Sequence, residues 1–117
     1  MQRQFPVSFT VPGTLAADVP FIFVAPDGCQ LVEVSAVATN PSDAQLKIGD
    51  DVDDARSMVF KDIGDNSIPV VFGRQDFVGT EFPVYQKGQI VVATLDFDGA
   101  AGTAANNVTL LMTFTVS

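Results

Sequence analysis

Most of the residues that could do chemistry in this chain are aspartates, and the densest group of them spans five positions. The group consists of Asp50, Asp51, Asp53 and Asp54. Carboxylate oxygens are the hard ligands that Ca²⁺ prefers, so these side chains are candidate calcium ligands. Their spacing differs from an EF-hand loop, which carries acidic residues at alternate positions, a glycine at the sixth and a glutamate at the twelfth. A solvated loop or a helix N-terminus is therefore the interpretation we favour.

A second pair of carboxylates, Asp96 and Asp98, lies two residues apart. On a strand both side chains would face the same side of the sheet. Paired carboxylates can carry out acid–base chemistry or glycoside hydrolysis. The residues that follow are Gly, Ala and Thr, with no aromatic platform for a sugar. The pattern is more typical of a strand end whose aspartates form hydrogen bonds into a turn.

The usual nucleophiles and bases of enzymes are poorly represented. The chain has no histidine, so it lacks the commonest general base and the commonest metal ligand. Cys29 is the single cysteine and follows Asp27, whose charge would raise the thiol pKa. We expect Cys29 to be a small apolar filler, and we expect neither an enzyme nor a cofactor.

The charge balance bears on the class of partner. The chain of 117 residues has 14 acidic and six basic residues and a formal charge of −8. The basic residues lie scattered along the sequence, which argues against binding to nucleic acid or to an anionic membrane. No apolar run approaches the roughly 20 residues that span a bilayer, and we expect no secretory signal at the start.

The elements that must position these side chains are short strands. Apolar residues alternate with polar ones, and Gly and Pro mark most of the boundaries. The expected strands cover residues 5–11, 19–25, 31–39, 44–48, 68–72, 82–85, 90–97 and 108–116. About eight strands at this spacing predict one all-β domain over residues 1–117, an antiparallel and jelly-roll-like β-sandwich. Pro6 and Pro83 lie in strands that should be at sheet edges.

The segment 49–64 is ambiguous in sequence. Asp53 and Asp54 could open a short helix over residues 53–61, because acidic side chains favour a helix N-terminus. A strand over residues 57–60 is the competing interpretation.

The last third of the chain holds two strongly apolar runs, residues 90–97 and 108–116, which we expect to lie in a sheet with at least one buried face. The linker between them contains mainly Asp, Gly, Ala, Thr and Asn. We expect it to be a chemically silent connection whose small residues would let another subunit approach closely.

The N-terminus is a candidate of a different kind. A short polar segment precedes the first strand and could extend to add to a neighbour's sheet. It consists of Met1, Gln2, Arg3, Gln4 and Phe5. A frayed terminus is the alternative.

Several stretches resemble small proteins encoded near the major capsid gene of tailed bacteriophages. They are residues 87–114, Asp-Ile-Gly-Asp-Asn-Ser-Ile-Pro at 62–69, Asp-Phe-Val-Gly at 76–79 and Phe-Thr-Val-Pro-Gly-Thr-Leu at 9–15. The resemblance is to capsid decoration, or cement, proteins. It implies a compact β-module on the outer surface of the virion, made in the host bacterial cytoplasm. It also implies a homo-oligomer, often a trimer, that clamps neighbouring major capsid subunits through loops and an N-terminal arm.

Two other functions remain open at this stage. One is a non-catalytic carbohydrate- or receptor-binding module of a phage fibre or a bacterial surface protein. Such platforms usually use exposed Trp or Tyr, and this chain has no Trp and only Tyr85. The other is a hydrolase that uses Asp96, Asp98 and the 50–54 cluster, which the missing histidine and aromatic residues disfavour.

Overall fold

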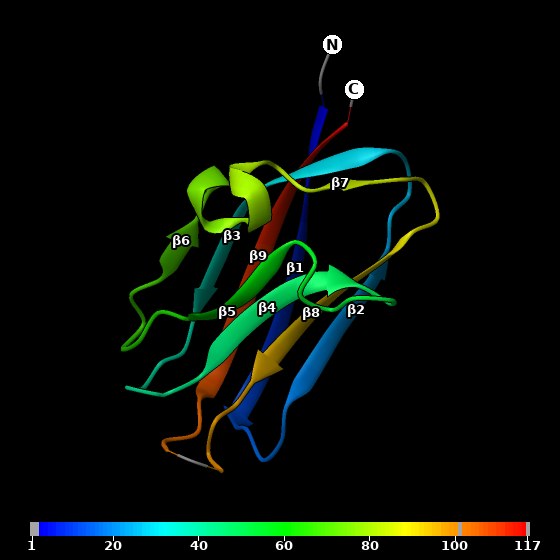
Figure 1. Cartoon of the computed structure of the whole chain (residues 1–117). Coiled ribbons are helices and arrows are strands. Elements are labelled where there is room, and N and C mark those ends of the chain that lie inside the picture. The colour runs from blue at the N-terminus through cyan, green and yellow to red at the C-terminus, as the bar shows by residue number, and fades with distance from the viewer. Residues whose placement is uncertain (1–2, 101, 117) are drawn as a thin grey trace.

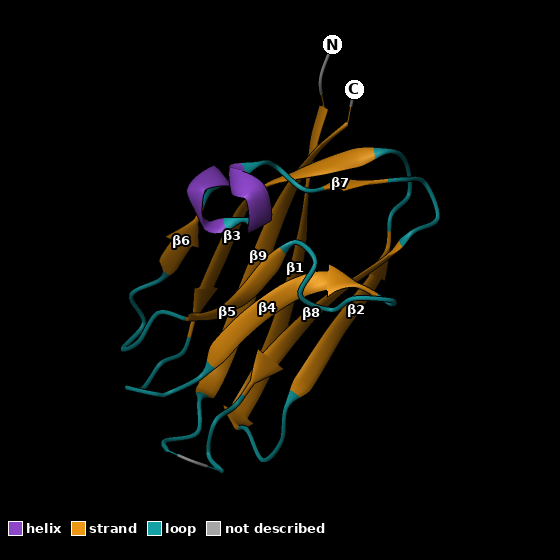
Figure 2. Cartoon of the chain, in the orientation of Figure 1, coloured by secondary structure: helices purple, strands orange, loops and turns teal. Residues whose placement is uncertain are grey.

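The chain folds into two antiparallel β-sheets packed face to face, as a computed structural model shows for residues 3–100 and 102–116 (Figure 1). Within those residues there are nine strands and two short 3₁₀ turns, η1 (Arg74–Asp76) and η2 (Val78–Thr80) (Figure 2). The predicted all-β antiparallel sandwich is therefore confirmed. No helix of the described residues is long and apolar enough to cross a membrane.

The first sheet has the order β1-β9-β3-β6, and β7 pairs with another part of β3. Its strands are β1 (Arg3–Thr14), β9 (Asn106–Val116), β3 (Cys29–Val37), β6 (Val70–Phe72) and β7 (Val84–Tyr85). The second sheet has the order β2-β8-β4-β5. Its strands are β2 (Val19–Val24), β8 (Ile90–Asp96), β4 (Gln45–Asp50) and β5 (Met58–Asp62).

The strand pairs are nested around the centre of the sequence. β4 pairs with β5, β3 with β6, β2 with β8 and β1 with β9, and every pair is antiparallel. The chain is thus one long hairpin rolled up so that successive pairs fall in opposite sheets. This nesting brings the two ends of the sequence side by side in β1 and β9 (Figure 1).

The alternating pattern of the sequence becomes the two faces of each sheet. In β9, Val108, Leu110 and Phe114 are buried, and the residues between them are more exposed. Phenylalanine rings pack within and between the sheets: the Phe114 ring centroid lies 5.2 Å from that of Phe5 in the same sheet and 5.1 Å from that of Phe23 in the other. Burial of one such side chain contributes about 1.5–3 kcal/mol, so these rings stabilise the sandwich strongly.

The helix predicted over residues 53–61 is wrong, and the competing strand is right in substance. Asp50 is 3% exposed, and its carboxylate accepts hydrogen bonds from the N–H groups of Val52 and Asp53. This turns the chain back, and Ser57 N–H then donates to Ile48 C=O at 2.9 Å to begin the pairing with β5. The hydrogen bonds that the Asp50 side chain accepts from the backbone, rather than local helix propensity, decide the conformation of this segment.

The two C-terminal apolar runs are both strands, but they lie in opposite sheets. β8 pairs with β2 and β4, whereas β9 pairs with β1 and β3. The connection between them crosses from one sheet to the other. At Gly102 an added Cβ would lie 2.2 Å from the Asp43 carboxylate, so this small residue makes room for the molecule's own loop.

The proline positions mark sheet edges, as the sequence predicts. β1 carries Pro6 and pairs only with β9, and the segment that contains Pro83 leads into β7, which pairs only with β3 among the described strands. Proline at an edge removes a free donor without breaking a central ladder, which limits uncontrolled pairing.

Candidate functional site

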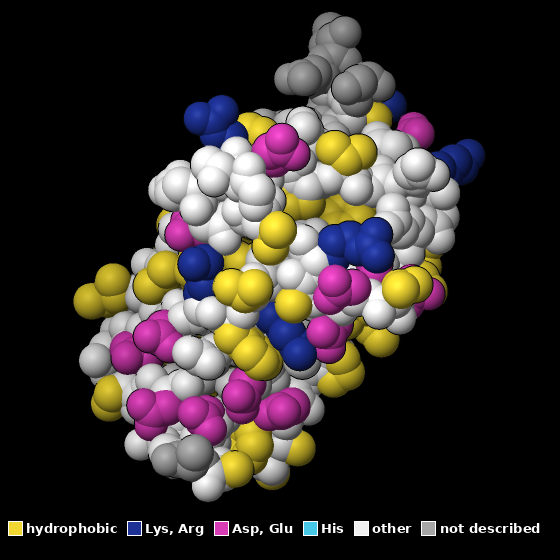
Figure 3. Space-filling model, in the orientation of Figure 1, with side chains coloured by type: hydrophobic (Ala, Val, Ile, Leu, Met, Phe, Trp, Pro, Cys, Tyr) yellow, Lys and Arg dark blue, Asp and Glu magenta, His cyan; other side chains and the backbone are white. Residues whose placement is uncertain are grey.

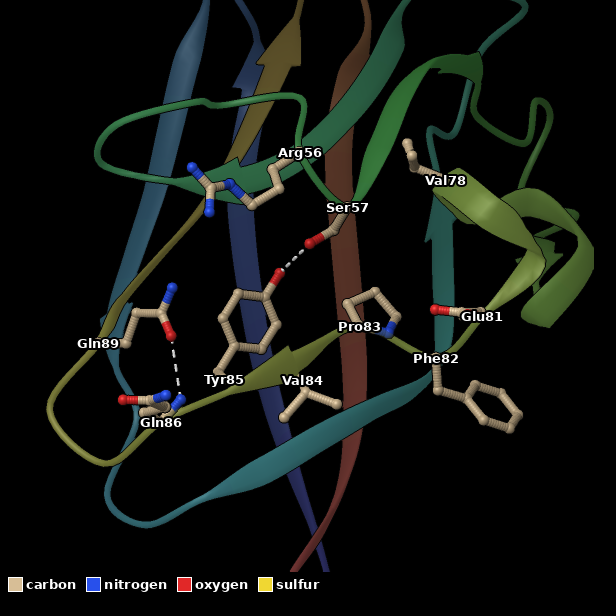
Figure 4. Close-up of a pocket in the computed structure, with 10 residues that line it drawn as sticks. All are labelled: Arg56, Ser57, Val78, Glu81, Phe82, Pro83, Val84, Tyr85, Gln86 and Gln89. Carbon is tan, nitrogen blue, oxygen red and sulfur yellow. Dashed lines mark hydrogen bonds between the residues drawn. The ribbon is translucent and has the colours of Figure 1, made fainter.

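A groove of about 460 Å³ runs along β7 and is the candidate binding site (Figure 4). Residues 81–86 form one side of it, and Arg56, Ser57, Val78 and Gln89 form the rest of its wall. The groove therefore lies where the edge of the first sheet meets the β4–β5 connection of the second.

Tyr85 closes the floor of the groove and joins the two sheets. Its side chain points from β7 toward Ser57, and the two hydroxyl groups form a hydrogen bond (Figure 4). The ring packs edge-on against Phe114, with 6.2 Å between centroids. Burial raises the pKa of Tyr85 to about 12, so the phenol is neutral at physiological pH. The hydrogen bond between Tyr85 and Ser57 therefore holds the two sheets together.

One wall of the groove is held in place by a polar network around Asp50. Arg56 Nε lies 3.1 Å from Asp50 Oδ2, and Gln89 Nε2 donates to the same oxygen at 3.3 Å. Gln89 Oε1 in turn accepts the N–H of Gln86 at 3.0 Å (Figure 4). The N–H of Asp53 is the main cause that holds the pKa of Asp50 below its usual value, with Val52, Arg56 and Gln89 acting in the same direction against burial. The charged carboxylate fixes this wall.

The four candidate calcium ligands, Asp50, Asp51, Asp53 and Asp54, do not form one site. Asp50 points into the network just described, Asp54 pairs with Lys47 at 3.0 Å, and Asp53 accepts the N–H of Ala55 at 3.1 Å. Asp51 is exposed. No group of three or more His, Cys, Asp or Glu side chains is placed to hold a metal ion within the described residues. The cluster organises the β4–β5 connection.

The Asp96 and Asp98 pair lies at the end of β8, where the Asp96 carboxylate and the backbone of Asp98 form the turn that follows. Asp98 N–H donates to Asp96 Oδ1 at 3.0 Å, and Asp18 Oδ1 accepts the N–H of Phe97 at 3.2 Å. Burial, followed by the charge of Asp18, raises the pKa of Asp96. The predicted strand end with side-chain hydrogen bonds into a turn is what the structure contains.

Acidic side chains gather at the end of the sandwich opposite the termini (Figure 3). Asp43, Asp62, Asp65 and Asp98 surround a hollow of about 400 Å³ there. Asp43 Oδ2 accepts the N–H of Thr103 at 2.7 Å, and Asp65 Oδ1 accepts the N–H of Ser42 at 3.2 Å. These carboxylates hold the loops of this end together, so we name it the acidic end.

The predicted N-terminal arm is divided by the structure. Arg3, Gln4 and Phe5 extend β1 and face Val116, Thr115 and Phe114 of β9. Met1 and Gln2 lie outside the described residues. The part of the segment that is described is therefore a strand of the sandwich rather than a free extension.

The burial of two side chains, Cys29 and Tyr85, bears on what the sequence predicts for each. Cys29 is 5% exposed in the core, and burial followed by the charge of Asp27 raises its pKa, as expected for an apolar filler. Tyr85 is 2% exposed. A carbohydrate platform built on this ring, which the alternative function would need, is therefore not present at Tyr85.

The outer face of the second sheet carries an aliphatic patch. Ile22 and Val24 of β2 are each 57% exposed, and they face Val92 and Ile90 of β8 across the ladder. We call these four residues the β2–β8 patch. Contiguous exposed apolar surface of this kind commonly marks an interface.

Sequence reasoning found the strand edge at Pro83 but not the groove beside it. The groove depends on the pairing of β7 with residues 29 and 30 and on the bond between Tyr85 and Ser57. Both connect positions far apart in the sequence, so no local pattern signals them.

The fold is shared with a solved phage structure. A chain of the cyanophage Pam1 capsid asymmetric unit is similar to this chain with a TM-score of 0.59 and 16% sequence identity, over 99% of this chain and 85% of that one. At this identity the likeness shows a common fold. No family model matches the sequence, and no curated protein matches it.

Proposed function

We propose that this chain is a non-catalytic structural protein of a phage virion, which decorates the outside of the capsid and cements neighbouring major capsid subunits. The observation that carries the proposal is the fold shared along 99% of the chain with a phage capsid component. Because one fold can host many functions, the surface must support the proposal as well.

The strand order supports a capsid role. The nested pairs β4–β5, β3–β6, β2–β8 and β1–β9 form what we interpret as a jelly roll, an arrangement that viral capsid and lectin domains use. The lectin alternative has less support, because its expected aromatic side chain, Tyr85, lies in the floor of the groove.

The charge supports a place outside the shell. A net charge of −8 repels the phosphates of packaged DNA, so the interior surface is a poor location. The acidic end, which projects four carboxylates around one hollow, is suited to face solvent. We also propose that the protein binds neither nucleic acid nor membrane.

The β2–β8 patch suits assembly into a homo-oligomer, for which we favour a trimer. The patch contains no charged side chain, so two copies of this acidic chain can meet there without opposing carboxylates. An oligomer that binds several capsid subunits at once gains retention by multivalency even when each contact is modest.

The test is the protein composition of purified virions. Quantitative mass spectrometry should find this chain in a fixed ratio to the major capsid protein, resistant to a salt wash that removes loosely bound proteins. Its absence from virions, or a copy number far below that of the capsid subunits, would contradict the proposal.

A further inference from the structure

Among residues 3–100 and 102–116, the strand β7 pairs with β3 alone, so one of its edges is free, and the direction of that edge follows from the register. Leu31 N–H donates to Pro83 C=O at 2.8 Å, and the next facing pairs are Gln30 with Val84 and Cys29 with Tyr85. Facing pairs in an antiparallel ladder alternate between hydrogen-bonded and non-hydrogen-bonded. Since Leu31 and Pro83 form a bonded pair, Val84 is in a non-bonded pair. Its N–H and C=O therefore point away from β3.

The groove lies on that side of β7. Its lining includes residues 81–86 but no residue of β3, so it borders the edge that β3 leaves free. The side chain of Val84 is 68% exposed. A donor and an acceptor on an extended backbone, beside an open groove, match the backbone of another extended segment.

The neighbouring outward positions define the length of this edge. Positions 82, 84 and 86 alternate along it, and the N–H of Gln86 is already bound by Gln89 Oε1. The free edge thus ends at Gln86 and is centred on Val84. Five residues of extended chain cover about 13–14 Å, which is room for a short added strand.

We propose that the β7 groove receives an extended segment of a major capsid subunit, which adds to β7 as a short strand and bonds to the backbone of Val84. This inference rests on the proposed function. The chain's own Arg3–Phe5 stretch is already paired with β9 and is not the added strand, so the capsid subunit that the proposed function makes the partner supplies it. Backbone bonds supply affinity, and an apolar side chain of the segment would rest beside the half-buried Phe82.

The experiment compares two variants at one position. Val84→Pro removes the outward N–H and places a ring in the groove, but it leaves the bonds to β3 intact because this N–H does not face β3. Val84→Ile keeps the N–H and the strand preference and is the matched control. The probe is a capsid shell purified without this protein. We expect Val84→Pro to bind shells about tenfold less tightly than Val84→Ile, as for one lost hydrogen bond near the upper end of its usual contribution.

A second measurement uses the unaltered chain. Hydrogen exchange followed by mass spectrometry should show that peptides covering residues 82–86 become protected when the protein binds shells. Equal binding of both variants, or unchanged exchange in bound protein, overturns the inference alone. Failure of the wild-type chain to bind shells overturns the proposed function as well. If Val84→Pro instead changes the oligomeric state in ultracentrifugation, the added strand belongs to a second copy and the capsid segment is wrong.

Discussion

The polar groups of the acidic end and those of the β7 groove point in opposite directions. At the acidic end, carboxylates turn inward to the backbone of their own loops, as Asp43 does to Thr103 and Asp65 to Ser42. At the β7 groove, the backbone of Val84 turns outward from the sheet. At the acidic end these carboxylates form hydrogen bonds within the molecule, whereas at the β7 groove backbone groups are available for hydrogen bonds to a partner.

This difference separates stability from binding. Removing a side chain at the acidic end should weaken the fold and leave binding to shells unchanged. Changing the free edge at Val84 should weaken binding and leave the fold nearly unchanged. The core between the two ends should affect both properties, because it supports both.

The largest effect is expected from Phe114→Ala. The ring is fully buried and contacts Phe5, Phe23 and Tyr85. Loss of a buried Phe side chain costs about 3–5 kcal/mol, because a cavity remains. Urea unfolding should show this loss. Leu111→Ala on the outer face of the same strand is the control and should change the free energy of unfolding far less. Similar losses for the two variants would contradict the assigned core.

A smaller effect is expected at the acidic end from Asp43→Ala. The substitution removes the hydrogen bond from Thr103 N–H to Asp43 Oδ2, which is 2.7 Å long. A hydrogen bond of this kind contributes about 0.5–1.5 kcal/mol to the free energy of unfolding. The exposed Asp51, changed to Ala, removes the same charge without a comparable bond and serves as the control. Shell binding of Asp43→Ala should equal that of wild type. If Asp43→Ala binds shells more weakly and its free energy of unfolding is unchanged, the acidic end serves binding rather than stability, which contradicts the assignment.

The smallest effect is expected from Asp96→Asn, and it depends on pH. Because burial raises the folded-state pKa of Asp96 above its usual value, the ionised carboxylate weakens folding at neutral pH. This penalty is relieved as the pH falls through the folded pKa. Asn keeps an oxygen to accept the N–H of Asp98. The variant should be slightly more stable than wild type at pH 7, and the difference should shrink toward pH 4. A difference that grows toward low pH would contradict the burial of Asp96.

The sequence predicts most of the strands because their longer members cover alternate side chains, a pattern readable from residues such as the half-buried Phe5, Val7 and Phe9. It fails where a single side-chain hydrogen bond or the pairing of distant strands decides the conformation. The carboxylate of Asp50 replaces a helix with a turn, and the nested pairing places β8 and β9 in opposite sheets. The sequence shows neither end, since the hydrogen bond from Thr103 to Asp43 spans 60 residues and the pairs of β7 with β3 join Val84 to Gln30 and Tyr85 to Cys29.

Cryo-electron microscopy of the intact virion would show where the sandwich sits on the shell and which of its two ends meets the capsid. We expect density for this sandwich on the outer surface of the shell, with the β7 groove against a major capsid subunit and the acidic end, around Asp43 and Asp65, toward solvent. A shell whose outer surface lacks this density, or a sandwich bound with its acidic end against the capsid, would contradict this expectation.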